Sequence, residues 1–209
     1  TDDYASLGSS VQIDAGDASA DVTVTPVDDD AVEGTESVVM TLAAAAGYAI
    51  DTPSSATVNI ADNDAAFDGF ESGAFTGGEG FVENTWSTLG VMDVVDTGTP
   101  YSGDYHLRLR DRCDTQRTVD LTGYSSAKLE LAWKAVSFET GDGATVEIYD
   151  NGSWSTLLTI DDDDDDGSWH TESIDLSSYT LNDEVIFRIS ADMGDLDDTL
   201  YIDDVAVVV

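Results

Sequence analysis

Carboxylates are the most numerous side chains that could do chemistry in this sequence. Asp and Glu together number 44 among 209 residues, against 7 Lys and Arg, and the formal net charge is -37. A pair of carboxylates can hydrolyse a glycoside, but in so acidic a chain such a pair occurs almost anywhere and does not indicate an enzyme. A net charge of this size opposes compaction unless cations neutralise part of it, so we expect bound or condensed cations.

The residue types that usually carry catalysis are sparse. His106 and His170 are the only histidines, and Cys113 is the only cysteine. No nucleophile elbow, His-Glu-x-x-His helix or glycine loop opening a helix is present. We therefore expect a non-catalytic protein, in which Cys113 forms no intrachain disulfide and behaves as a small buried hydrophobe.

Two groups of residues could instead recognise a ligand. Arg108, Arg110 and Arg112 alternate with leucine and aspartate, so in a strand all three guanidinium groups would project from one face. Such a strip could bind uronate or sulfate groups, or it could be neutralised by neighbouring carboxylates, which we favour. Trp86 and Trp154, and also Trp169, could stack on sugar rings or belong to a core, as tryptophans of a β-sandwich more often do.

The charge excludes two classes of partner. Nucleic acids need clusters of Lys and Arg to meet their phosphates, and a membrane surface is disfavoured for the same reason. The sequence contains no run of about 18 apolar residues, so it predicts no membrane-spanning helix. A composition dominated by Asp, Ser, Thr, Gly and Val is typical of a secreted prokaryotic or cell-surface β-protein in calcium-rich surroundings, and a halophilic source is an alternative explanation.

The elements that must position these residues are strands. Short alternating segments rich in Val, Thr and Ile are bounded by Gly, Asp, Asn and Ser, and no stretch keeps a helical period. The sequence predicts strands at 11–15, 20–27, 36–44, 55–62, 105–111, 127–139, 144–160, 169–176, 184–192 and 200–209. Asp150-Asn151-Gly152 predicts a hairpin turn within 144–160, and the six aspartates of 161–166 predict a solvated loop. A domain boundary is expected near residues 62–68.

The first third of the chain resembles the Calx-beta family. Val32-Glu33-Gly34-Thr35-Glu36 and the closing Asp62-Asn63-Asp64 carry the resemblance over residues 1–64. It implies an immunoglobulin-like β-sandwich in which two acidic loops bind Ca²⁺, an ion that takes six to eight oxygen ligands. The ligands implied by the resemblance are Asp28, Asp29, Asp30, Glu33, Glu36, Asp62 and Asp64. A solvated acidic loop without a specific site is the alternative.

The resemblance begins about two strands into the family's fold. An incomplete sandwich exposes apolar surface and an unpaired strand edge. We therefore expect either a shortened chain or a neighbouring copy or module that donates the missing strand.

The remainder, residues 65–209, resembles MAM-like and carbohydrate-binding jelly-roll modules. The signposts include Gly69-Phe70-Glu71-Ser72-Gly73, Trp86, Pro100-Tyr101-Ser102-Gly103 and the closing Tyr201-Ile202-Asp203-Asp204-Val205. In such modules the first and last strands are neighbours, so the resemblance implies a second cation site. Its expected ligands are Asp68, Glu71, Asp104, Asp203 and Asp204. An acidic, solvent-exposed edge is the alternative.

Three functions remain open at this stage. The leading hypothesis is a calcium-binding extracellular structural or adhesion protein, which could assemble into a filament by strand donation into its incomplete first module. The alternative is a carbohydrate-binding accessory module of a secreted hydrolase, with polysaccharide as the partner. The third is a passive spacer. The expected fold class is all-β in each case, and fold does not imply function.

Overall fold

The computed structural model describes residues 4–27, 36–60, 64–150 and 152–209, and of Glu36 and Asp64 only the backbone. The chain divides into two compact units, Thr1–Asp62 and Asn63–Val209. This division lies two residues before the expected end of the first module. No helix among the described residues is long and apolar enough to cross a membrane.

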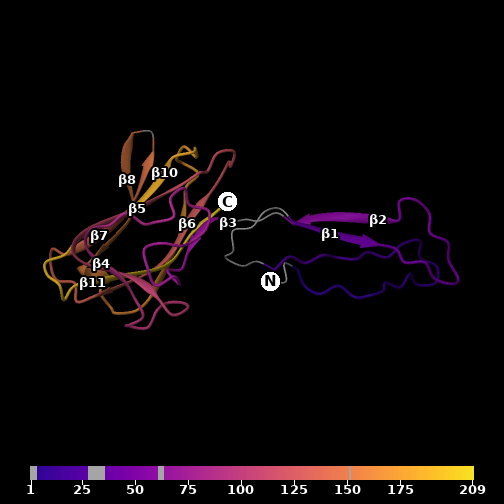
Figure 1. The fold of residues 1–209 in the computed structure, drawn as a ribbon, viewed down its shortest axis with the longest axis horizontal. Coiled ribbons are helices and arrows are strands. Elements are labelled where there is room, and N and C mark those ends of the chain that lie inside the picture. The colour runs from indigo at the N-terminus through magenta and orange to yellow at the C-terminus, as the bar shows by residue number, and fades with distance from the viewer. Residues whose placement is uncertain (1–3, 28–35, 61–63, 151) are drawn as a thin grey trace. The chain divides into compact units, whose positions relative to one another are not determined.

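In the first unit, strands β1 (Glu36–Thr41) and β2 (Ser55–Ile60) form an antiparallel ribbon (Figure 1). The strands expected at 11–15 and 20–27 are not strands in the structure, which has only an isolated bridge between Tyr4 and Pro26. No regular ladder pairs these segments in the described part of the unit, and Asp14 and Asp17 close a turn where the first of them should end. Val38 is the one buried hydrophobic residue described in this unit.

The second unit holds the remaining strands in one continuous series of pairings, in the order β8-β7-β10-β5-β11-β6-β9, with β3 beside β11 and β4 beside β5. Their bounds are β3 Asp64–Asp68, β4 Leu89–Val95, β5 His106–Val119, β6 Lys128–Val136, β7 Gly143–Asp150, β8 Ser153–Asp161, β9 His170–Asp175, β10 Val185–Asp192 and β11 Thr199–Val208. The run of aspartates forms a short 3₁₀ turn, Asp162–Asp164, that no buried residue anchors.

Strand β5 connects the two layers of this unit. Its first half pairs with β4 and β11, and its second half pairs with β10. Between the halves a bulge opposite Gly90 and Val91 shifts the register, and Asp111 adopts a φ of 55°. Because a bulge bends and twists a strand, it lets the sheet fold over itself.

Side chains from both layers meet in one core. Val146, Ile148, Phe187 and Ile189 come from β7 and β10, while Leu129, Leu131, Leu200 and Ile202 come from β6 and β11. Along β7 and β10 strict alternation sends every second side chain inward and leaves the others outside, whereas β6 and β11 are buried over most of their length. The expected all-β, jelly-roll sandwich is confirmed for the second unit.

Candidate functional site

The outward side chains of β7, β8, β10 and the second half of β5 form a continuous surface, which we call the open face. Each of its members is partly exposed, and their neighbours along the strand are mostly buried. The open face consists of Asp114, Gln116, Thr145, Glu147, Tyr149, Trp154, Ile186, Arg188 and Ser190. The strand register places Arg188 between Glu147 on one side and Gln116 on the other.

Arg188 organises the middle of the open face. Its Nε donates to Oε2 of Glu147 at 2.7 Å, and its Nη2 forms an ion pair with the same oxygen at 2.6 Å. The guanidinium carbon lies 3.9 Å from the centroid of the Trp154 ring. Tyr149 lies on β7, directly opposite Trp154 of β8, and the centroids of the two rings are 5.3 Å apart. Because these contacts fix the guanidinium plane and both rings, the surface is ordered before any ligand arrives.

This arrangement suits a sugar chain chemically. A pyranose ring offers a C–H face that packs on an aromatic ring and equatorial hydroxyls that need planar donors and acceptors. Trp154 and Tyr149 supply the rings, and Glu147, Arg188 and Gln116 supply the polar groups. Sites of this kind combine apolar contact area with a few placed hydrogen-bonding groups.

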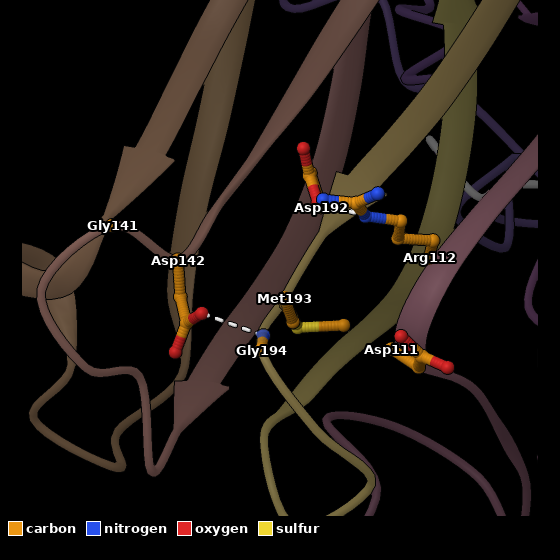
Figure 2. Close-up of a pocket in the computed structure, with 7 residues that line it drawn as sticks. All are labelled: Asp111, Arg112, Gly141, Asp142, Asp192, Met193 and Gly194. Atoms are coloured by element: carbon orange, nitrogen blue, oxygen red, sulfur yellow. Dashed lines mark hydrogen bonds and ion pairs between the residues drawn. The ribbon is translucent and has the colours of Figure 1, made fainter.

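A polar pocket lies where β10 ends and β7 begins, beside the bulge in β5 (Figure 2). Its volume is about 330 Å³. Arg112 donates to Asp192 at 2.6 Å across it, and Gly194 N donates to Asp142 Oδ1 at 2.6 Å. The remaining lining residues are Asp111, Gly141 and Met193. Its polar groups are thus largely engaged with one another.

The expected arginine strip is divided by the bulge. Arg108 and Arg110 share the outer side of the first half of β5, and both contact Asp93, at 2.5 and 3.6 Å. The Arg108 hydrogen bond holds the pKa of Asp93 below its ordinary value. Arg112 follows the bulge and belongs to the pocket with Asp192. Arg108, Arg110 and Arg112 therefore do not form one strip, because alternation does not continue through a bulge.

The three candidate tryptophans lie in different surroundings. Trp154 lies on the open face, as a sugar-binding role would require. Trp86 is only 1% exposed and donates from Nε1 to Asp68, so it belongs to the core and cannot stack on a ligand. Trp169 is partly exposed, but its Nε1 donates to the Thr99 carbonyl at 3.0 Å, which holds it against a loop.

Glu147, Tyr149, Arg188 and Gln116 were not predicted as site residues from the sequence. The alternation of Gly143–Asp150 and Val185–Asp192 could have placed the first three opposite the core residues of their strands. What no local pattern reveals is that β7 and β10 are neighbours, since 41 residues separate Glu147 from Arg188.

The first predicted calcium site lies mostly outside the described residues. Asp28, Asp29, Asp30, Glu33 and Asp62 are among those not described. For Glu36 and Asp64 the structure gives only positions on β1 and β3. The calcium prediction for the first module therefore stays a prediction.

Most of the second set surrounds the loop of residues 100–105. Glu71 accepts the backbone N–H groups of Asp104 and Tyr105. Asp203 Oδ2 accepts those of Tyr101 and Ser102, at 3.0 and 3.2 Å. Among the described residues, no three acidic, histidine or cysteine side chains are grouped so that they could hold a metal ion.

Three members of this set have particular surroundings. Asp203 is fully buried, and burial, with a contribution from the Asp204 carboxylate, raises its pKa to about 7. Ser102 Oγ donates to Asp204 at 2.7 Å. Asp68 has a different role from the predicted one, because it forms a buried ion pair with Arg117 at 2.6 Å and accepts hydrogen bonds from Phe70 N and Trp86. These donors already occupy its oxygens.

Comparison with known proteins gives structural matches only. No protein-family model matches the chain, and no curated protein matches it. A xylan-binding family 22 module of Xyn10C from Paenibacillus barcinonensis superposes with a TM-score of 0.50 and 13% identity, over 71% of this chain and 97% of that one. The family 22 and catalytic modules of xylanase 10B from Clostridium thermocellum, complexed with xylohexaose, give 0.52 and 16%, over 71% and 29%.

The shared feature is the fold. A module described as TmCBM61 in complex with β-1,4-galactotriose aligns at 17% identity and a TM-score of 0.48, over 66% of this chain and 92% of that one. At these identities the β-sandwich of carbohydrate-binding modules is what the chain has in common with them. The Calx-beta and MAM-like resemblances of the sequence stay predictions.

Proposed function

We propose that the second unit is a non-catalytic carbohydrate-binding module that holds a polysaccharide chain on the open face. The observation that carries the proposal is the grouping of Tyr149 and Trp154 with the Arg188–Glu147 pair on the outer surface of one sheet layer. Two partly exposed aromatic rings beside preoriented polar groups are typical of a site that recognises sugar rings.

The width of the open face fits a chain rather than a single sugar. Neighbouring strands lie about 4.8 Å apart, which is close to the length of one pyranose residue in an extended chain. The surface crosses β8, β7, β10 and β5 without an intervening loop among the described residues. A ligand that crosses the strands could therefore place several consecutive sugars over Trp154, Glu147, Arg188 and Gln116.

The proposal extends to the protein's role. One of the two superposed family 22 modules is described as binding xylan, and the other belongs to a xylanase and is complexed with xylohexaose. For this chain we infer an accessory role outside the cell, in which polysaccharide binding keeps a linked hydrolase or a cell surface at its substrate. Catalysis plays no part in it.

Affinity electrophoresis tests the proposal, with gels that contain arabinoxylan, β-1,4-galactan or hydroxyethyl cellulose. The protein should be retarded by at least one of them, and Trp154→Ala should weaken retention about ten-fold, because ring stacking contributes about 0.5–1.5 kcal/mol beyond buried area. Trp169→Ala is the matched control, since that ring is held against a loop, and it should bind normally. No retention in any gel, or equal retention of the Trp154 variant, would overturn the proposal.

A second candidate function has one observation in its favour. The first unit leaves many large apolar side chains exposed, among them Val39, Leu42, Tyr48 and Val58, beside a ribbon of two strands. A two-stranded ribbon is marginally stable alone. We therefore retain, as a proposal, a calcium-dependent scaffold in which a neighbouring copy adds a strand to the first unit. Sedimentation with calcium and with chelator tests it: a monomer under both conditions, at every concentration, would rule it out.

A further inference from the structure

The arginines of this protein are already engaged. Each arginine lies against a carboxylate: the pairs are Arg108–Asp93, Arg110–Asp93, Arg112–Asp192, Arg117–Asp68 and Arg188–Glu147. Since all seven basic residues fall within the described part of the chain, only the two lysines remain to be placed.

Neither lysine serves the open face. Lys134 is buried, and its ammonium donates to the Gly98 carbonyl at 2.8 Å between the rings of Trp169 and Tyr201. Lys128 lies on β6 opposite Asp175 of β9. Both strands belong to the end of the strand series remote from β7 and β8. Arg188 is thus the one cation in the middle of the open face, while Arg112, which the register places on the same side of β5 as Asp114, lies at its edge and pairs with Asp192.

Arg188 is poorly available to a new anion. Trp154 covers one side of its guanidinium plane, and Nε and Nη2 point at Glu147. Its side chain is 26% exposed, and that of Glu147 is 15% exposed. A carboxylate or sulfate on a sugar would have to approach within a few ångströms of Glu147, with Asp114 nearby on the same surface. Like charges at such distances repel strongly when water is partly excluded.

We propose that the open face selects polysaccharides without ionised groups and rejects chains that carry uronate or sulfate. The inference rests on the proposed function and names the ligand class. It replaces the idea of an anion-binding arginine strip, because each arginine is paired with a carboxylate, which leaves hydroxyl-binding groups and aromatic rings to meet a ligand. The overall charge of -37 acts in the same direction.

Matched pairs of polysaccharides test the inference. Hydroxyethyl cellulose is compared with carboxymethyl cellulose, and arabinoxylan with glucuronoxylan, at 0.02, 0.15 and 1 M NaCl. We expect at least ten-fold weaker retention by the acidic member of whichever pair binds, at 0.15 M. Any residual acidic binding should strengthen as salt rises, because salt screens repulsion. Equal retention of both members, or acidic binding that salt weakens, would overturn the inference.

A charge variant makes the test specific. Glu147→Gln removes the carboxylate that occupies Arg188, so retention by the acidic polysaccharides should rise several-fold. Asp93→Asn is the matched control, because it frees Arg108 and Arg110 on the other layer and should give no gain. Should the Glu147 variant fail to fold, Thr145→Lys adds a cation to the open face and should produce the same gain. If neither Glu147→Gln nor Thr145→Lys gains binding to the acidic polysaccharides, the charge argument is wrong.

The outcomes separate the two proposals. If neither member of any pair retains the protein, the proposed carbohydrate binding itself fails. If both members bind equally, carbohydrate binding stands and only the selection of uncharged chains is lost.

Discussion

The guanidinium carbon of Arg188 lies 3.9 Å from the centroid of the Trp154 ring, although the two residues are on strands that do not pair with each other. The intervening strand, β7, supplies Glu147 to hold Arg188 and Tyr149 to flank Trp154. The candidate site therefore depends on one local pairing, the β7–β8 hairpin, and one distant pairing, β7 with β10. Substitutions that disturb β7, β8 or β10 should therefore alter the open face.

Arg188→Lys should weaken polysaccharide binding about ten-fold, or about 1.4 kcal/mol, while the protein remains folded. Lysine keeps the charge, but it cannot present a planar fork to Glu147 and stack on Trp154 at once. Titration calorimetry with the polysaccharide that binds best measures the loss. Arg108→Lys is the control on the other layer, and an equal loss there would mean that the effect is not local to the open face.

The β7–β8 hairpin could be predicted from the sequence. Val146, Ile148 and the turn after Asp150 predict two adjacent strands, and the structure has them as β7 and β8. Strand β4 was missed, since Leu89–Val95 contains Gly90 and Asp93 and gives a weak strand pattern. The bulge was also missed, because it depends on how Gly90 packs against β5, a contact between two separate strands.

The acidic composition limited the prediction of the site. With so many carboxylates, sequence alone could not tell Asp68, which neutralises a buried arginine, from Glu71, which caps the backbone of a loop. Those roles depend on which strands meet, and long-range pairing is not encoded in any short window. Composition predicted that nucleic acids and membrane surfaces are disfavoured as partners, and this stays a prediction.

Asp68→Asn should lower the free energy of unfolding by about 3 kcal/mol or more. The change removes the ion-pair partner of the buried Arg117 guanidinium, and breaking a buried pair costs about 3–5 kcal/mol. The side chains of Arg117 and Asp68 are 1% and 5% exposed. Urea unfolding followed by tryptophan fluorescence measures it. Asp93→Asn, in a more exposed pair, should cost no more than about 1 kcal/mol. Similar losses for both would show that burial is not the cause.

Gly90→Ala should destabilise the second unit far more than Gly123→Ala. Both glycines have a positive φ, 99° and 95°, so both variants carry the same backbone strain. A Cβ at position 90 would lie 2.0 Å from the Arg112 carbonyl oxygen, whereas at position 123 nothing lies within 4 Å. Thermal unfolding by circular dichroism separates the two effects. Equal shifts in Tm would show that strain alone matters and that the bulge tolerates a side chain.

Asp203 should make the protein less stable as the pH rises from about 4 to about 7. Its pKa is raised to about 7 in the folded state by burial, while an unfolded Asp titrates near 3.9. Between these values the folded protein holds a proton that the unfolded chain has released. Stability therefore falls as pH rises, by up to about 4 kcal/mol at 1.4 kcal/mol for each pH unit.

The comparison with Asp203→Asn isolates this contribution. His106, whose pKa burial lowers, contributes with the opposite sign below about pH 6.5, but it is unchanged in the variant. The variant loses an acceptor for one of the N–H groups at Tyr101, Ser102 or Asp204, at a cost that does not depend on pH. Unfolding is measured from pH 4 to 8 in chelating buffer, then with added Ca²⁺. We expect the parent's downward slope to become shallower in the variant, where Asp198, whose pKa burial also raises, still contributes in the same direction. If Ca²⁺ binds at Asp203, it should restore stability to the parent near pH 7 and not to the variant, because the ion needs the ionised carboxylate. Parallel stability-against-pH curves for the parent and the variant, both without and with Ca²⁺, would contradict both expectations.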